Sequence, residues 1–168
     1  MAKYLADVSG VMTEVTAITS TTGAPDAGKI IGLDGAGLID ISFLPVGVGA
    51  EVTVAPSSEN LTSGNFVNMY NNTVINVRKA DATTASKPAH GFVLANVISP
   101  ANATVYGISN KNTAQSGMTI GAREYLGTTA GDVTGTAPSA AGNIVQYLGI
   151  AQTAAALVYS NETYWVKV

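Results

Sequence analysis

The residue in this sequence best suited to acid–base chemistry is its single histidine, His90. A histidine titrates near neutral pH and can act as a general base when a carboxylate orients its ring. His90 stands in the segment 87–92, at the entry to an apolar stretch, and no Ser-x-Gly nucleophile elbow or other partner motif accompanies it. We therefore expect His90 to have a structural role.

The acidic residues Asp34 and Asp40 resemble a fragment of a calcium-binding loop. The fragment lacks the third and fifth oxygen ligands and the glutamate at the twelfth position. The dipeptide Asp34-Gly35 is instead a strong signal for a tight turn. The eleven Asp and Glu residues of the chain are dispersed, so no pair of carboxylates predicts glycoside hydrolysis across a cleft. We expect no catalytic and no metal-binding residues.

The remaining motifs predict no cofactor site. The chain has no cysteine, which excludes disulfides, thiolate zinc sites and cysteine nucleophiles. Gly47-Val48-Gly49 lacks the third glycine and the following helix of a dinucleotide fingerprint. Asn-x-Thr triplets would matter in a secreted eukaryotic chain, but in this Thr- and Asn-rich, bacterial-type chain we interpret them as chance; they begin at Asn60, Asn71, Asn102 and Asn161. We expect no cofactor and no enzymatic activity.

The aromatic residues are scattered through the expected strands rather than grouped in one segment. Sugars stack on aromatic rings, so these residues could form a carbohydrate platform. Aromatic residues in strands more often pack in the core or across the sheet, and we expect that role here. Weak binding of a host-surface glycan stays open as an alternative. The residues are Tyr70, Tyr106, Tyr125, Tyr147, Tyr159, Tyr164 and Trp165.

The composition indicates a surface that is poor in charge. Charged residues make up 11% of the chain and apolar residues 46%, whereas a typical soluble domain is about 25% charged. Much of the surface must therefore consist of Thr, Ser, Asn, Ala and Gly. Such a surface packs well against neighbouring proteins, which favours a subunit of an assembly.

Charge and hydropathy exclude two classes of partner. The net charge is −3 and the eight Lys and Arg residues are spread singly, so no basic stripe is available to neutralise nucleic-acid phosphates. No apolar run approaches the length of a membrane span. Residues 1–7 lack the apolar core of a signal peptide. We expect no nucleic-acid partner, no membrane partner and synthesis in a cytosol.

The elements that must carry these residues are predicted to be short strands, because Thr, Val and Ile are frequent between turn signals. In the first part of the chain we predict strands over 12–18 and 29–33 and a return strand over 38–44 after the turn at 34–37. Further along, residues 151–156 are interpreted as loop or strand, since they are too few and lack caps for a helix. The other predicted strands cover 52–54, 66–70, 73–78, 90–97, 103–108, 123–126, 133–136, 144–150, 157–159 and 164–168.

The spacing of these strands predicts an all-β protein in two parts. Residues 1–48 are expected to form an extended N-terminal arm with a short hairpin, which ends where Pro45 and the glycines after it interrupt the pattern. Residues 49–168 are expected to form a compact antiparallel β-barrel or β-sandwich, because strands about ten residues apart with turns between them are typical of both.

Four segments together resemble a family of virion structural proteins from tailed bacteriophages. The first, residues 23–45, reads GAPDAGKIIGLDGAGLIDISFLP, and the second, residues 58–68, reads SENLTSGNFVN. The third and fourth are residues 77–97 and 116–150. The segments consist of turns and apolar strand positions rather than catalytic signatures, and their joint occurrence in this order carries the resemblance. Residues 110–112 and 123–125 depart mildly from the family pattern.

The resemblance implies a structural role in the virus particle. Proteins with this module occur as capsid decoration proteins, also called cement or head-fibre proteins, and as parts of tail fibres. A short arm, one compact domain and the lack of heptads favour decoration, with a tail-fibre or baseplate component in host attachment as the alternative. The expected partners are the major capsid protein and further copies of the chain, in a homotrimer rather than a dimer. The expected location is the outer capsid surface, after assembly in the bacterial cytoplasm.

Overall fold

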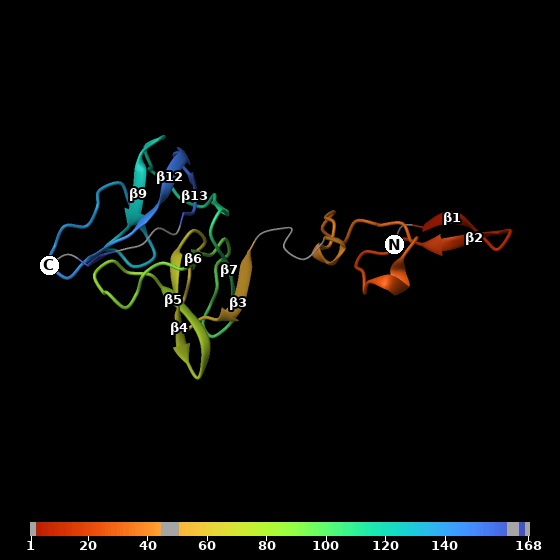
Figure 1. Cartoon of the computed structure of the whole chain (residues 1–168), viewed down its shortest axis with the longest axis horizontal. Coiled ribbons are helices and arrows are strands. Elements are labelled where there is room, and N and C mark those ends of the chain that lie inside the picture. The colour runs from red at the N-terminus through yellow and green to blue at the C-terminus, as the bar shows by residue number, and fades with distance from the viewer. Residues whose placement is uncertain (1–2, 45–50, 161–164, 167–168) are drawn as a thin grey trace. The chain divides into compact units, whose positions relative to one another are not determined.

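The computed structural model describes residues 3–44, 51–160 and 165–166, and over these residues the protein is all-β, as predicted. The chain divides into two compact units, Met1–Gly49 and Ala50–Val168 (Figure 1). The boundary predicted between residues 48 and 49 lies outside the described residues. Within the described ranges, no helix is both long enough and apolar enough to cross a membrane.

The N-terminal unit is built on one β-hairpin. Strands β1 (Lys3–Val8) and β2 (Val11–Thr16) pair in antiparallel register, with Val8 opposite Val11. Ser9 and Gly10 form the two-residue turn, and both have positive φ angles, 56° and 84°. That combination is the type I′ turn, whose twist matches that of the strands. Asp7 Oδ1 accepts a hydrogen bond of 2.6 Å from the Gly10 N–H and closes the turn.

The hairpin predicted over residues 29–44 is wrong, although its turn exists. Asp34 Oδ1 accepts hydrogen bonds from the N–H groups of Ala36 and Leu38, at 2.8 and 2.9 Å. The flanking residues form no strand: Ile31 makes one isolated bridge to Ile18, and Ile41–Phe43 is the short 3₁₀ helix η2. Strand propensity reflects packing on neighbouring strands, and these apolar side chains have no sheet to pack on. The other 3₁₀ helix, η1, is Ala24–Asp26.

The C-terminal unit contains two five-stranded antiparallel sheets. The first has the order β3 (Val52–Pro56), β7 (Asn102–Tyr106), β6 (Gly91–Phe92), β4 (Phe66–Asn72) and β5 (Val74–Lys79). The second has the order β10 (Val133–Thr134), β9 (Arg123–Leu126), β12 (Tyr147–Thr153), β13 (Ala156–Val158) and β8 (Lys111–Asn112). A short pair joins β11 (Ile144–Val145) to β14 (Trp165–Val166).

The two sheets pack on each other around one apolar cluster, which makes the unit sandwich-like. Phe66 and Phe92 of the first sheet lie in this cluster with Leu126, Leu148 and Leu157 of the second. The opposite face of the first sheet holds a second cluster, of Val67, Val77, Val105 and neighbours. Because adjacent strand residues point to opposite faces, Phe66 and Val67 supply both clusters. An isolated bridge from Ser57 to Val77 brings the sheet's edges together, but the described strands form no closed barrel.

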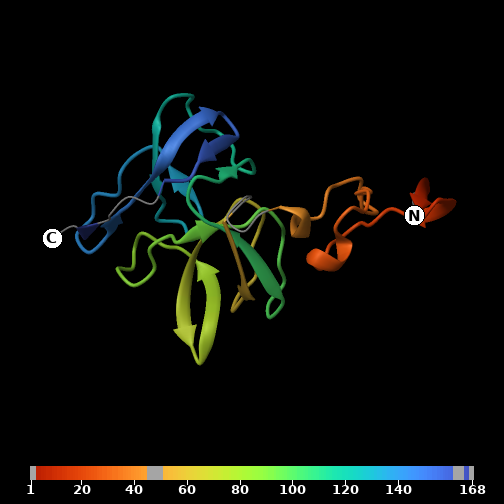
Figure 2. The ribbon, with the colours of Figure 1, turned by 45° about the vertical axis from the view of Figure 1, so that its right-hand side comes forward.

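The hairpin of β4 and β5 agrees closely with the prediction for residues 66–78. Asn72 pairs with Val74 across the tip, and Thr73 adopts a positive φ of 68°. Figure 2 shows this pair as the two yellow-green arrows that project from the rest of the unit. The prediction of one strand over residues 90–97 is wrong, since only Gly91 and Phe92 pair as strand. The periodicity of a short apolar run does not show where strand pairing ends. Here it ends at Phe92, and the next residue, Val93, packs in the second cluster.

Two buried side chains fix the segment that leads into β6. The side-chain amide of Gln146 donates to the Ala89 carbonyl at 2.8 Å and accepts from the Ala89 N–H at 2.7 Å. The Tyr159 hydroxyl donates to the same carbonyl at 2.9 Å, and burial raises the pKa of Tyr159. Buried backbone groups must be satisfied in this way where no strand pairs with them. The contacts hold residue 90 in place.

Candidate functional site

His90 has the structural role that the sequence predicts. Its ring Nδ1 atom accepts a hydrogen bond of 3.0 Å from the Met69 backbone N–H. The backbone N–H of His90 donates to the Val67 carbonyl at 2.8 Å. The ring thus continues the pairing of β6 with β4 by one residue. The half-buried ring lines a hollow of about 180 Å³ with Glu51 and Thr53. Because Nδ1 accepts, the proton of the neutral ring sits on Nε2.

The His90 site predicts a pH dependence of stability. Burial lowers the pKa of His90 below 6.5. The unfolded chain therefore takes up a proton first as the pH falls, and the free energy of unfolding should decrease below about pH 6.5. His90→Asn places an amide oxygen near the position of Nδ1 and should remove this step, with a change of about 1 kcal/mol or less at pH 8. Urea unfolding at pH 5 to 8 measures both effects.

A second variant separates the hydrogen bond from the titration. His90→Ala should lose roughly 1–3 kcal/mol at pH 8, because the Met69 N–H then has no acceptor, and this difference from the wild type should shrink as the pH falls. If the Asn variant kept the wild-type pH dependence, another group would be responsible for it.

The carboxylates of the calcium-like segment are occupied by the backbone. Asp34 holds its own turn, and Asp40 Oδ1 accepts a hydrogen bond of 2.8 Å from the Ser42 N–H. The hydrogen bonds from Ser42 hold the pKa of Asp40 below its usual value. No group of three or more His, Asp or Glu side chains with the geometry of a metal site occurs among the residues that the structure describes.

The other motifs lie apart from one another. Asn60 Oδ1 accepts a hydrogen bond from the Ser99 N–H at 3.0 Å, Asn71 is exposed near the end of β4, and Asn102 is exposed at the start of β7. Asn161 and the segment 47–49 lie outside the described residues.

The aromatic residues divide between the core and two surface pairs. Tyr159 and Tyr106 pack on Phe92 in the sandwich, with ring centroids 6.3 and 5.6 Å apart. On the surface, Arg78 lies over Tyr70, 4.3 Å from the ring centroid. Tyr125 and Tyr147 meet edge to face at 6.1 Å, and Arg123 covers Tyr147. The aromatic rings that the structure describes therefore do not form one continuous platform, and Tyr164 and the side chain of Trp165 lie outside this description.

The N-terminal unit exposes its apolar side chains. Ala17 is the buried apolar residue of the described range 3–44. Two antiparallel strands alone are marginally stable in water, so this unit lacks a core of ordinary size. Ten large apolar residues are more than 40% exposed: Leu5, Val8, Val11, Met12, Ile30, Ile31, Leu33, Leu38, Ile39 and Leu44.

The charged residues of this unit bond within the unit. Lys3 pairs with Glu14, and Lys29 pairs with Asp26 at 2.7 Å. The three other carboxylates, those of Asp7, Asp34 and Asp40, accept backbone hydrogen bonds in their turns. The surface that a partner would meet over residues 3–44 therefore combines exposed apolar side chains with charged groups that are bonded within the unit.

One face of the hairpin carries no charge. Residues directly opposite each other in the register share a face, and three such pairs place only uncharged side chains together. The other face carries Lys3, Asp7 and Glu14. We call the first the uncharged hairpin face; its residues are Tyr4, Ala6, Val8, Val11, Thr13 and Val15.

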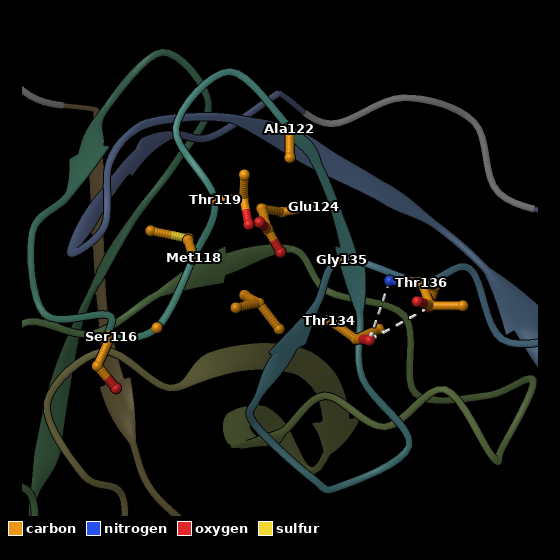
Figure 3. Close-up of a pocket in the computed structure, with 10 residues that line it drawn as sticks. Ser116, Met118, Thr119, Ala122, Glu124, Thr134, Gly135 and Thr136 are labelled. Atoms are coloured by element: carbon orange, nitrogen blue, oxygen red, sulfur yellow. Dashed lines mark hydrogen bonds between the residues drawn. The ribbon is translucent and has the colours of Figure 1, made fainter.

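The C-terminal unit holds a pocket around one buried carboxylate, that of Glu124 on β9. The side chain of Glu124 is only 2% exposed, and Figure 3 shows its carboxylate pointing into the pocket. The pocket has a volume of about 390 Å³. We call it the Glu124 pocket; its lining is Ser116, Gly117, Met118, Thr119, Ala122, Glu124, Val133, Thr134, Gly135 and Thr136.

The Glu124 carboxylate has no hydrogen-bond donor among the described residues. None of the protein's hydrogen bonds or ion pairs there includes it, and its oxygens keep access to the pocket. Burial raises the pKa of Glu124 above its usual 4.5. A buried carboxylate normally accepts two or more hydrogen bonds or pairs with a cation. Among the described residues, the fold therefore supplies no hydrogen-bond partner for this carboxylate.

Sequence reasoning missed Glu124, although a signal was present. In the segment 123–126, alternation places Glu124 on the same face as Leu126, and Leu126 is fully buried. A charged residue on the core face of a strand is unusual. The pattern Arg-Glu-Tyr-Leu could have indicated this buried charge. It could not have indicated the pocket, because the loops that line it lie before and after β9 in the sequence.

Comparison with known proteins assigns no family to this chain. No protein-family model matches it, and neither a curated protein nor a solved structure shows a significant match. Its function is therefore inferred from the surfaces and the pocket described above.

Proposed function

We propose that the protein is a capsid decoration protein of a tailed bacteriophage, which binds the outer surface of the head and links neighbouring capsid subunits. The observation that carries the proposal is the exposed apolar surface of the N-terminal unit, where ten large side chains face solvent and the charges are bonded internally. A surface of this kind is typical of a protein that completes its core on a partner. The family resemblance of residues 23–45 supplies the kind of partner.

The energetics are consistent with docking of this unit on a shell. Burying one Val, Leu or Ile side chain contributes roughly 1.5–3 kcal/mol, so a few of the ten would offset much of the ordering cost of association. A specific interface needs about 800 Å² per partner. Docking through the uncharged hairpin face would leave the exposed pair of Lys3 and Glu14 in solvent, because both lie on the other face of the hairpin.

The C-terminal unit would supply contacts between copies of the protein. Its two sheets enclose a core of their own, so it needs no partner to bury that core. A homotrimer at three-fold positions is proposed in preference to a dimer at two-folds, because several linked arms bind a symmetric shell with high effective concentration. Mass measurement of the purified protein by light scattering distinguishes the two states.

The number of copies per particle tests the proposal. Gel densitometry of purified particles should give on the order of hundreds of copies, because a decoration protein follows the symmetry of the shell. A count of a few to a few tens would support a tail-fibre or baseplate component instead. Particles that lack the protein should also release their genome at lower temperature. Equal genome retention with and without the protein would contradict the stabilising role.

A further inference from the structure

The Glu124 pocket combines features that no part of the fold uses. Glu124 is 2% exposed as a residue, its carboxylate faces a space of about 390 Å³, and it has no hydrogen-bond donor among the described residues. Both oxygens face Gly135, since a Cβ atom built there would lie 3.9 and 4.0 Å from them. We propose that the Glu124 pocket binds a primary alkylammonium group. This proposal does not rest on the capsid role.

The charge of the lining favours a cation. Glu124 is the one ionisable residue among the ten that line the pocket, so no Lys, Arg or His of the lining can pair with it. An ammonium group neutralises the charge of a desolvated carboxylate and donates short, charge-assisted hydrogen bonds to it. Burial raises the pKa of Glu124, and a cation bound beside the carboxylate would favour its charged form.

The other polar groups suit an ammonium ion better than a metal or a guanidinium. One carboxylate does not supply the several oxygens that Ca²⁺ or Mg²⁺ requires. Hydroxyl groups of Ser116, Thr119 and Thr136 belong to segments on either side of β9 in the sequence. An ammonium has three donors that rotate freely, whereas a guanidinium presents its donors in one plane.

The apolar part of the lining suits the carbon chain of the ligand. Met118, Ala122 and Val133 supply methyl and thioether groups within the pocket. Thr134 and Thr136 bond to each other, with the Thr136 N–H 3.2 Å from the Thr134 Oγ1 (Figure 3). No aromatic ring lines the pocket, so it lacks the stacking platform typical of sugar sites.

NMR titration of the full chain with n-butylammonium tests the proposal. The expected result is saturable binding, seen at the Glu124 Cδ carbon and the amides of residues 134–136, whereas n-butanol of similar shape should not bind. Saturating n-butylammonium should also shift the titration of the Glu124 Cδ to lower pH, because the ligand binds the ionised form. Equal responses to butanol, or an unchanged Cδ titration, would overturn the proposal.

Three variants locate the site. Glu124→Gln keeps the shape of the side chain and should weaken binding by roughly tenfold or more. Gly135→Val keeps the carboxylate but fills the space that both oxygens face, and it should weaken binding similarly. Asp132→Asn removes one exposed negative charge nearby and should leave binding unchanged. Weakening by Asp132→Asn as large as by Glu124→Gln would point to nonspecific attraction and overturn the proposal.

Stability provides a check that needs no ligand. Because the pKa of Glu124 is raised in the folded state, its contribution to stability is present below about pH 4.5 and is lost as the pH rises. The Tm of Glu124→Gln should therefore exceed that of the wild type at pH 7, and the difference should shrink towards pH 4. A lower Tm for this variant at pH 7 would mean that the carboxylate bonds within the protein, which contradicts an open site.

Titration with two further ligands distinguishes whether the amine comes from a protein or from a free polyamine. Nα-acetyl-lysine methylamide represents a lysine side chain of a protein, and 1,4-diaminobutane represents a free polyamine. Both carry the proposed group, so tighter binding of either one supports the site and identifies its class of ligand. Tighter binding of methylguanidinium than of n-butylammonium, or binding of neutral sugars alone, would overturn the assignment.

Discussion

Replacing Val11 with glutamate should abolish association of the protein with phage heads. Val11 is 63% exposed and lies on the uncharged hairpin face. Burying an unpaired carboxylate in an apolar interface costs several kcal/mol, and 2.7 kcal/mol is about a hundredfold in affinity. Cosedimentation with heads that lack the protein should therefore show binding weakened by roughly a hundredfold or more.

Met12→Glu is the matched control for this variant. Met12 follows Val11 in β2, is 65% exposed, and points to the opposite face, which already carries Asp7 and Glu14. The same charge is added at nearly the same place, so binding should change much less. Thermal unfolding of the C-terminal unit should be equal in both variants. Equal binding by Val11→Glu and the wild type would exclude the uncharged hairpin face as the docking surface.

Gly64→Ala should produce a large loss of stability in the C-terminal unit. Gly64 has a φ of 94°, and a Cβ atom there would lie 2.2 Å from the carbonyl oxygen of Ala114. Its own carbonyl accepts hydrogen bonds from the side chains of Asn112 and Gln115, at 2.9 and 2.6 Å. The loop before β4 and the segment after β8 are joined at this point. We expect a loss of roughly 3–5 kcal/mol, because steric displacement adds to the backbone strain.

Gly142→Ala separates these two causes. Gly142 has a φ of 83°, but no atom lies within 4 Å of the position of its Cβ. It should therefore lose only the roughly 1–2 kcal/mol that a left-handed conformation costs a non-glycine residue. Denaturant unfolding of both variants gives the comparison. Equal losses would show that the φ angle alone, and not the contact with Ala114, requires glycine at residue 64.

Local signals in the sequence predicted the parts of the fold that depend on neighbouring residues. The pair β4 and β5 was predicted because a polar tip separates two strand-like runs, and the turn at 34–37 was predicted from Asp and Gly. The all-β class followed from many short runs rich in Thr, Val and Ile. The structural role of His90 followed from the absence of any partner motif around it.

Three parts of the chain were predicted poorly, for different reasons. Residues 29–33 have strand propensity, but no sheet lies beside them. Residues 3–8 form β1 because they pair with β2 across a type I′ turn at Ser9 and Gly10, and no strand was predicted there. Residues 90–97 are mostly apolar, and only the packing shows that strand pairing ends after Phe92.

The sequence by itself determined that this protein is all-β, poor in charge, free of cysteine and without a recognisable catalytic motif, because composition and short-range patterns suffice for these properties. Only the tertiary structure decided that the N-terminal unit leaves its apolar side chains exposed while its charged side chains bond within the unit. It also decided that Glu124 lies in a pocket without a hydrogen-bond partner among the described residues. Both features depend on which side chains the fold covers, and burial is set by packing rather than by spacing in the sequence.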